Sequence, residues 1–599
     1  MIEQARQALK QWFGYDTFRK GQEQLVEALL DGKDALAVMP TGAGKSICYQ
    51  LPALMLPGTT LVVSPLISLM KDQVDALNEM GIPTAFINST LRADELNRTM
   101  REIEAGKYKM VYIAPERLDS ERFMRLVSTL PIPLVAVDEA HCVSQWGHDF
   151  RPSYMHITKL LRQIDPRPVV SAFTATATDK VKDDIVHHLK LSRPVRVTTG
   201  YARDNLTFSV VKGVDKRKFL AAYLQQRTGQ SGIIYASTRK EVESCRDYLL
   251  RLGIEAGRYH AGLSEQERAD SQEKFLYDEL KVMVATNAFG MGIDKSNVRF
   301  VLHYNVPKNV ESYYQEAGRA GRDGEPGECV LLYAPQDTMT QKFLIEQSES
   351  DEQRKQIDYA NLRDMIDYCH TTGCLQKHVV TYFGERNAVD CGRCSSCTDE
   401  REVVDITEHA QKIFSCIVRM KQRFGITMTA KVLRGSNDAK VRQFGFNRLP
   451  TYGVMGNNKE KEIVQLINVL AADGYLRLSD SQYPVLSLTK QALAVLEGTE
   501  KVWQRVTIVQ QAAEHTQLAG DEELFDRLRQ LRKSFAEKAK VPPFTIFHDA
   551  TLREMTVRLP ASEAELSTVK GVGDRKLERY GQAFLQVIAE YAGQASKQV

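Results

Sequence analysis

The chain has 599 residues, of which 43% are hydrophobic and 26% are charged, and its formal net charge is only +3. The length predicts several globular domains, and the near-neutral charge excludes a uniformly basic binder of nucleic acid. No apolar run is long enough to cross a bilayer and the N-terminus is not a signal peptide, so we expect a cytoplasmic protein without a membrane partner.

Residues 1–200 alternate short apolar runs with helical patterns. Each run is β-rich and apolar on both faces, which is typical of strands buried in a parallel sheet. This alternation predicts a doubly wound α/β domain. The expected strands are Ala35–Met39, Thr60–Ser64, Met110–Ala114, Leu134–Val137 and Val169–Phe173.

The first expected strand leads directly into a glycine-rich turn and then a helical run. Glycines let backbone N–H groups converge on phosphate oxygens at the start of a helix. Lys45 is expected to reach the β- and γ-phosphates, and the Ser46 hydroxyl to ligate Mg²⁺. Met39 replaces the glycine that opens the strict pattern, so the loop departs from that pattern at its first position. The loop residues are Thr41, Gly42, Gly44, Lys45 and Ser46.

An acidic run follows the strand Leu134–Val137. Ligands bind at the carboxyl ends of strands in such sheets. We expect Asp138 to hold Mg²⁺ and Glu139 to orient and activate the attacking water. His141 is a further catalytic candidate.

Residues 204–335 repeat the α/β pattern, with strands expected at Gly232–Ala236, Val282–Ala285, Arg299–Tyr304 and Cys329–Tyr333. Gln315, Arg319 and Arg322 then lie in or beside a glycine-rich turn. Such arginines stabilise charge on a leaving γ-phosphoryl group. Surface arginines in a glycine-rich turn are the structural alternative.

Five of the ten cysteines lie between Cys369 and Cys397. The spacing Cys391-x₂-Cys394-x₂-Cys397 can wrap one tetrahedral ion, with a fourth ligand from upstream. The competitors for that position are Cys374, Cys369 and His370. Zinc is favoured over an iron–sulfur cluster because the further cysteine of a ferredoxin run is missing.

The last 200 residues predict two small modules. Residues 401–505 read as helices followed by a two-stranded wing, Tyr475–Leu478 and Pro484–Leu488, with Tyr483 as a strand-separating wedge or an ordinary hairpin tyrosine. Residues 515–599 read as helical. Their glycine turn Gly571–Gly573 either binds a phosphate backbone or belongs to a solvated basic helix. The nearby cations are Lys570, Arg575, Lys576 and Arg579.

Almost the whole chain resembles the RecQ family of superfamily 2 DNA helicases. The resemblance rests on the segments Phe13–Gln22, Ser64–Gln73, Cys142–Pro152, Ala172–Ala177, Ala285–Asp294 and Tyr313–Gly324, together with the motifs above.

The resemblance implies roles for several residues. Tyr15, Arg19 and Gln22 match the positions that bind adenine, and Arg322 matches the arginine finger. Cys374 matches the upstream zinc ligand. Trp146, Phe150 and Arg151 match a loop that senses single-stranded DNA and couples it to ATP hydrolysis; the alternative is that both aromatic side chains are core.

The resemblance also implies a multidomain fold. We expect two RecA-like α/β lobes with parallel sheets, a helical zinc-binding subdomain, a winged helix and an all-α HRDC domain. The expected bounds are 1–203, 204–335, 336–400, 401–510 and 515–599.

The implied function is an ATP-dependent 3′-to-5′ DNA helicase of DNA repair and recombination, with ATP, Mg²⁺ and Zn²⁺ as cofactors. Its partners would be single-stranded and partial-duplex DNA, with a single-strand-binding protein as a candidate, and its location the nucleoid within the cytoplasm. Two alternatives stay open: an RNA helicase with similar lobes, and a DNA-binding scaffold that has lost catalysis.

Overall fold

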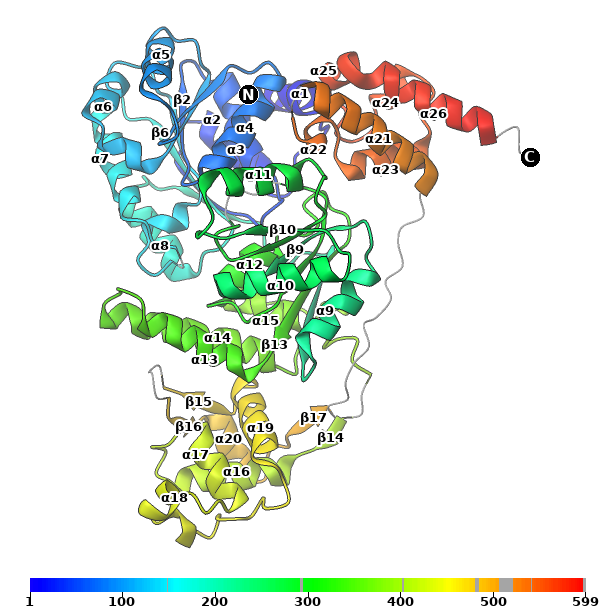
Figure 1. Cartoon of the computed structure of the whole chain (residues 1–599). Coiled ribbons are helices and arrows are strands. Elements are labelled where there is room, and N and C mark those ends of the chain that lie inside the picture. The colour runs from blue at the N-terminus through cyan, green and yellow to red at the C-terminus, as the bar shows by residue number, and fades with distance from the viewer. Residues whose placement is uncertain are drawn as a thin grey trace.

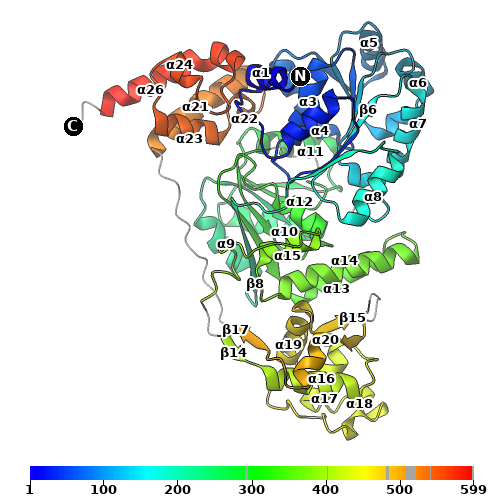
Figure 2. The ribbon, with the colours of Figure 1, turned by 180° about the vertical axis from the view of Figure 1, so that it is seen from behind.

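The chain folds into five units that follow one another in sequence. The structure, a computed structural model, describes residues 1–147, 149–290, 295–400, 403–479, 484–505, 521–539 and 541–595. Two α/β lobes lie against each other, with a helical segment and a small winged unit beyond the second lobe (Figure 1). The C-terminal helical domain lies beside the first lobe, as the view from behind also shows (Figure 2).

The first lobe is built on a seven-stranded parallel sheet of order β3-β4-β2-β5-β6-β1-β7. Its strands are β1 (Ala35–Val38), β2 (Thr60–Val63), β3 (Thr84–Ile87), β4 (Met110–Ile113), β5 (Leu134–Val137), β6 (Val169–Thr174) and β7 (Val195–Thr198). Its helices are α1 (Ile2–Phe13), α2 (Gln22–Leu30), α3 (Lys45–Met55), α4 (Ile67–Glu79), α5 (Ala93–Glu104), α6 (Glu121–Val127), α7 (Ile157–Gln163) and α8 (Asp179–His188). Apolar clusters cover both faces of this sheet, as a doubly wound fold requires.

The second lobe has a six-stranded parallel sheet of order β10-β11-β9-β12-β13-β8. Its strands are β8 (Leu206–Lys212), β9 (Ser231–Tyr235), β10 (Ala256–Tyr259), β11 (Val282–Ala285), β12 (Val298–His303) and β13 (Gly327–Tyr333). Its helices are α9 (Lys216–Gln225), α10 (Arg239–Arg251), α11 (Glu265–Leu276) and α12 (Val310–Ala317).

The strands expected from the sequence are confirmed in both lobes, with their ends displaced by at most two residues. Four further strands were not expected: β3, β7, β8 and β10. Each of them lies at the edge of its sheet.

A helical segment that carries the cysteines follows the second lobe. It contains α13 (Pro335–Glu346), α14 (Glu352–His370) and α15 (Leu375–Tyr382). The cysteine-bearing loop after α15 returns to the second lobe, where Ser395 N–H donates to Phe208 O at 2.9 Å.

The winged unit has its own apolar core. It contains α16 (Thr407–Arg419), α17 (Ile426–Arg434), α18 (Ala439–Gln443), α19 (Glu460–Ala472), the wing strands β15 (Leu476–Leu478) and β16 (Leu486–Leu488), and α20 (Lys490–Leu496). The predicted wing is confirmed. An antiparallel pair that was not predicted, β14 (Val403–Asp405) and β17 (Trp503–Arg505), joins the two ends of the unit, with Val403 opposite Arg505.

The C-terminal domain is all helical and has a separate core. Its helices are α21 (Glu522–Ala539), α22 (Pro543–Ile546), α23 (Asp549–Arg558), α24 (Glu563–Leu566), α25 (Asp574–Lys576) and α26 (Gln582–Ala595). The multidomain architecture expected from the sequence is therefore present.

Within the described ranges, no helix combines the length and apolarity needed to cross a bilayer. Three parts of the predicted motifs lie outside those ranges: His148, Met291–Asp294 and the wing residue Tyr483.

Candidate functional site

A cavity of about 420 Å³ lies between the two lobes. This volume is in the range of small-molecule sites. The interlobe cavity brings together predicted residues that are far apart in the sequence. Those lining it are Tyr15, Arg19, Gln22, Thr41, Gly42, Gly44, Lys45, Ser46, Asp138, Glu139, Gln315, Arg319 and Arg322.

The glycine-rich turn after β1 has the backbone of a phosphate loop. Gly42 and Gly44 adopt φ angles of 82° and 79°, which side chains other than glycine rarely tolerate. Helix α3 begins at Lys45, whose Nζ donates to Met39 O at 3.4 Å across the turn. The loop therefore presents a helix N-terminus and a lysine to the cavity, and both attract phosphate.

Residues that the resemblance assigns to adenine also support this loop. The Arg19 guanidinium donates to Gly42 O at 2.6 Å. The Gln22 amide donates to Gly44 O at 3.0 Å and to Ala43 O at 3.2 Å, and Gln22 Oε1 accepts from Arg19 N–H. Both side chains are thus fixed against the loop at the mouth where Tyr15 lies.

The acidic run follows β5 at the carboxyl edge of the sheet. Burial, and then the neighbouring Glu139 carboxylate, raises the pKa of Asp138 to about 7. Glu139 has a left-handed backbone (φ 46°), and its N–H donates to Asp138 Oδ1 at 3.0 Å. Two adjacent carboxylates, one buried, facing a cavity beside the Ser46 hydroxyl fit the oxygen donors that Mg²⁺ prefers.

His141 lies behind the carboxylates and does not line the cavity. Its ring is fully buried, with Nδ1 3.3 Å from Glu139 Oε2 and 3.0 Å from Thr174 Oγ1. Thr174 ends strand β6 and begins the Thr174–Ala177 segment. The structure places His141 as a link between Glu139 and this segment.

The second lobe supplies the opposite wall. Gln315 on α12 donates from Nε2 to Thr176 Oγ1 of the first lobe at 3.1 Å. A Cβ atom added to Gly42 would lie 3.3 Å from Arg322 Cα, so the arginine turn contacts the phosphate loop. The arginines of the turn therefore face the loop that would hold phosphate, and are not merely surface residues.

The C-terminal domain also reaches this cavity. The Tyr580 hydroxyl donates to Glu79 Oε1 at 3.1 Å, Arg579 pairs with the same carboxylate, and Arg575 donates to Met80 O. Arg529 of the C-terminal domain pairs with Asp278 of the second lobe, with Nη2 3.7 Å from Oδ2. The residues of this domain that line the cavity are Phe544, Thr545, His548, Lys570, Arg575, Lys576, Arg579 and Tyr580.

This docking adds a contact that neither alternative for the basic glycine turn included. A Cβ atom added to Gly14 would lie 2.5 Å from Gly573 N, so Gly571–Gly573 packs against the end of α1. The sequence contained no signal for this contact, because its two sides lie more than 500 residues apart.

A second and larger cavity, of about 1200 Å³, lies on the other side of the acidic run. Trp146 and Phe150 line it, and Trp146 is 42% exposed, so its ring is not core. Lys180 Nζ lies 2.9 Å from the centre of that ring. Arg151 does not line this cavity; it pairs with Asp149 at 3.0 Å and donates to Pro65 O at 3.1 Å.

The far wall of the second cavity comes from residues that the sequence did not single out. Lys308 and Asn309 belong to the second lobe, and Arg354 to α14. The Arg354 guanidinium donates to Gln145 O and, at 3.3 Å, to Gly147 O, so α14 holds the loop that carries Trp146. An aromatic face flanked by cations is a suitable surface for single-stranded nucleic acid.

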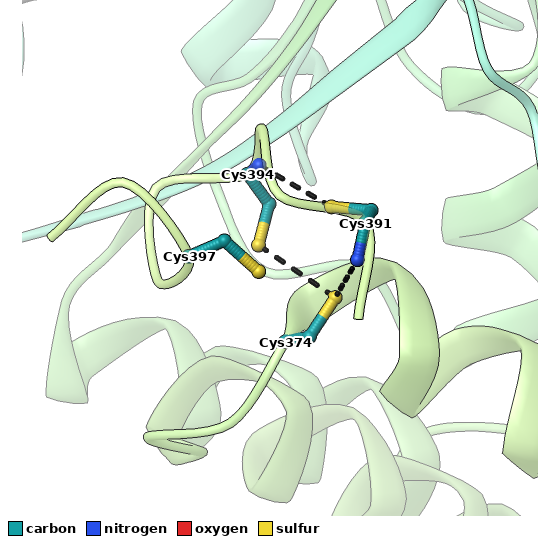
Figure 3. A group of neighbouring side chains, drawn as sticks. All are labelled: Cys374, Cys391, Cys394 and Cys397. Carbon is teal, nitrogen blue, oxygen red and sulfur yellow. Dashed lines mark hydrogen bonds between the residues drawn. The ribbon is translucent and has the colours of Figure 1, made fainter. Parts of the chain in front are cut away.

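The predicted zinc ligands converge. The Sγ atoms of Cys374, Cys391, Cys394 and Cys397 all lie within 4.8 Å of one another (Figure 3). Backbone N–H groups point at the sulfurs, as when Cys391 N–H donates to Cys374 Sγ at 3.2 Å and Leu375 N–H to Cys394 Sγ at 3.3 Å. These donors stabilise thiolates, and four thiolates suit tetrahedral Zn²⁺.

The two competitors for the fourth position lie elsewhere. Cys369 is buried, and its sulfur is not among the four that converge. His370 is also buried, with its ring 4.7 Å from that of Tyr333. Among the residues that the structure describes, the upstream member of the cluster is therefore Cys374.

Comparison with known families gives the same order of units. The matching models are "DEAD/DEAH box helicase" over residues 19–184, "Helicase conserved C-terminal domain" over 215–324, "RecQ zinc-binding" over 335–398, "RQC domain" over 400–513 and "HRDC domain" over 521–588.

Curated relatives match over nearly the full length. The chain is 50% identical to the ATP-dependent DNA helicase RecQ of Bacillus subtilis (strain 168), covering 99% of both chains. It is 40% identical to the protein of the same name from Haemophilus influenzae, covering 98% of this chain and 96% of that one. Identity to the RecQ-like DNA helicase blm-1 of Caenorhabditis elegans is 31%, over 99% of this chain and 66% of that one. With its zinc-binding, RQC and HRDC units in family order behind two helicase lobes, the chain belongs to the RecQ family of ATP-dependent DNA helicases.

Proposed function

We propose that this protein couples ATP hydrolysis to 3′-to-5′ movement along single-stranded DNA and to the unwinding of partial-duplex DNA, in repair and recombination. The observation that carries the proposal is the interlobe cavity, where Lys45 and Glu139 of one lobe face Arg322 of the other. A site divided between two lobes changes shape when they close and open, so hydrolysis can move the lobes relative to a bound strand. The polarity rests on family resemblance.

The roles of the nucleotide-site residues follow from their positions. Lys45 and the N–H groups of the phosphate loop would bind the β- and γ-phosphates, and Tyr15, Arg19 and Gln22 the adenine. Ser46 and Asp138 would hold Mg²⁺, which would neutralise phosphate charge when bound. Glu139 would orient the attacking water, while Arg322, with Arg319 beside it, would stabilise the transition-state charge.

DNA binding would reach this chemistry through the Cys142–Pro152 loop. Trp146 and Phe150 face the second cavity, whereas Glu139 faces the interlobe cavity only a few residues earlier in the chain. A strand that stacks on the aromatic rings would displace the loop and so reorient Glu139 and His141. Arg151 would act by holding the loop to Pro65 O rather than by contacting the strand.

The zinc centre would be structural. Four thiolates leave no open coordination position for a substrate or water. Zn²⁺ would fix the loop of Cys391–Cys397 to the start of α15 and thereby hold the winged unit near the lobes.

Two extensions concern the surroundings of the protein. A single-strand-binding protein is a candidate partner because it covers the strand that a helicase exposes. The DNA substrate makes the nucleoid, within the cytoplasm, the expected location.

Unwinding of duplexes with a 3′ or a 5′ tail, each with and without ATP, tests the proposal. We expect ATP-dependent unwinding of the 3′-tailed duplex alone, and its loss in Lys45→Ala. Robust unwinding by Lys45→Ala would exclude the proposal. Stimulation of ATP hydrolysis by RNA and DNA strands of equal length separates a DNA helicase from an RNA helicase, and any DNA-stimulated turnover excludes a non-catalytic scaffold.

A further inference from the structure

Arg203 lies where the chain crosses from the first lobe to the second, between β7 and β8. Its guanidinium donates to Thr41 O of the phosphate loop in the first lobe. It also donates to Gly321 O at 3.0 Å and to Ala320 O at 3.4 Å in the arginine turn of the second lobe. One side chain therefore joins the two backbone segments that carry Lys45 and Arg322.

The bonding of Arg203 depends on the shape of guanidinium. The oxygens that accept from its two terminal nitrogens are neutral carbonyls, and burial lowers the pKa of the group. A planar fork of five N–H donors can reach acceptors on two sides at fixed angles, whereas a lysine ammonium is a compact point charge. Asn205 assists from the same segment by donating to Gly321 O at 2.8 Å.

A second arginine fixes the backbone of Arg203 from the zinc side. Arg393 lies between Cys391 and Cys394, and its guanidinium donates to Arg203 O at 3.0 Å. The same group donates to Leu206 O at 3.2 Å and to Asp204 Oδ1 at 3.1 Å. The cysteine loop therefore lies directly on the crossing segment, and Arg393 and Arg203, through their hydrogen bonds and the chain between them, connect the zinc ligands with the phosphate loop.

We propose that Arg203 is a positioning residue that sets the distance between the phosphate loop and the arginine turn, and that Arg393 holds Arg203 in register from the zinc centre. Neither residue is assigned contact with the nucleotide. This inference rests on the proposed ATP hydrolysis and adds to it a role for the cysteine loop in the nucleotide site.

The expected kinetic signature separates positioning from binding. Nucleotide binding depends mainly on first-lobe groups, namely Lys45, Gln22 and the phosphate loop, which remain intact without Arg203. Transition-state stabilisation requires Arg322 at the correct distance, and small misplacements of catalytic groups cost large factors in rate. Loss of Arg203 should therefore lower kcat and leave KM for ATP nearly unchanged.

The test measures DNA-stimulated ATP hydrolysis of full-length Arg203→Lys, Arg203→Met and Arg393→Met. Arg386→Met, an exposed arginine of the same cysteine-rich segment, is the matched control. We expect kcat to fall about tenfold in both Arg203 variants and about threefold in Arg393→Met, with KM within about twofold. Thermal melting should show that each variant is folded at the assay temperature, and bound zinc, measured by chelator release, should equal that of the wild type.

A double variant tests whether Arg393 acts through Arg203. Because Arg393 is proposed to act through Arg203, Arg203→Met with Arg393→Met should lose no more kcat than Arg203→Met alone. Wild-type kcat in Arg203→Lys, or multiplied losses in the double variant, would overturn the proposal. The proposal would also be overturned if KM for ATP rose in Arg203→Met and returned to the wild-type value in Arg203→Lys, because a positive charge alone would then account for the role of Arg203. DNA-stimulated turnover of the wild type and its absence in Lys45→Ala, measured alongside, test the proposed function separately.

Discussion

Gln315 of the second lobe donates a hydrogen bond to the Thr176 hydroxyl of the first lobe at 3.1 Å, and both side chains are buried. Thr176 N–H in turn donates to Thr174 Oγ1, which contacts His141 Nδ1. A chain of polar contacts thus runs from the second lobe to the residue beside Glu139.

Breaking this contact should slow hydrolysis. Gln315→Met removes the donor while keeping the length of the side chain, and it leaves the buried Thr176 hydroxyl with one partner fewer. Because this bond joins the two lobes across the nucleotide site, its loss should misplace the catalytic groups, and we expect kcat to fall about tenfold. Thr176→Val should give a similar loss, and the double variant no further loss. Multiplied losses would show that the two residues act independently.

The buried carboxylate of Asp138 predicts a dependence of stability on pH. Its pKa in the folded protein, about 7, lies above the ordinary value of 3.8, so the folded state without Mg²⁺ or nucleotide binds the proton more tightly than the unfolded state. Stability should therefore decrease as the pH rises from about 4 to 7, and Asp138→Asn should remove this decrease.

Thermal melting in the presence of a chelator checks the prediction. The melting temperature of the variant should exceed that of the wild type by a few degrees at pH 8 and by a smaller amount at pH 5, where only part of the decrease has occurred. Asp94→Asn, which alters an exposed carboxylate on α5, is the control and should show no such difference. An equal difference in melting temperature between Asp138→Asn and the wild type at both pH values would contradict the raised pKa of Asp138.

The zinc centre can be tested with two cysteines five residues apart. Cys374→Ser should lose bound zinc and lower the first melting transition by on the order of 5–10 °C, because metal binding contributes to folding. Cys369→Ser changes a buried cysteine outside the cluster and should retain zinc. The zinc bound per protein is measured by mass spectrometry. A Cys374→Ser variant with as much bound zinc as the wild type would refute the assignment of Cys374 as a ligand.

The contact between Glu79 and Arg579 predicts control of nucleotide exchange by the C-terminal domain. Glu79→Arg places like charges together and should detach the domain from the mouth of the interlobe cavity. Dissociation of a fluorescent nucleotide, followed by stopped flow, should become several-fold faster, and the difference should shrink at high salt. Because both residues line the cavity, the control is the charge exchange Glu79→Arg with Arg579→Glu. Failure of that pair to restore slow dissociation would exclude the docking contact as the cause.

The sequence predicted the central strands of both lobes and missed the edge strands, two of which, β7 and β10, were missed for a physical reason. Central strands such as Leu134–Val137 are covered on both faces and read as unbroken apolar runs. The edge strand β10 has the sequence Ala-Gly-Arg-Tyr and is only partly buried, and β7 alternates buried with exposed positions. Neither carries the apolar signal on which the prediction relied.

The nucleotide and zinc residues were predictable because their spacing is local: a turn of seven residues, an acidic pair, a run of three cysteines. Contacts between distant segments were not. Arg203 lies in a hinge without a motif, Arg354 joins α14 to a loop some 200 residues earlier, and the C-terminal domain reaches the first lobe. Such contacts depend on how the domains are arranged, which no short pattern encodes.

The pairing of β14 with β17 brings the two ends of the winged unit together. Its first and last strands lie side by side, so the polypeptide enters and leaves at one point. A unit attached in this way can be removed or exchanged by rejoining the chain at one place. The path of the chain through the lobes and the C-terminal domain would stay the same. The winged unit can therefore vary in evolution independently of the two lobes.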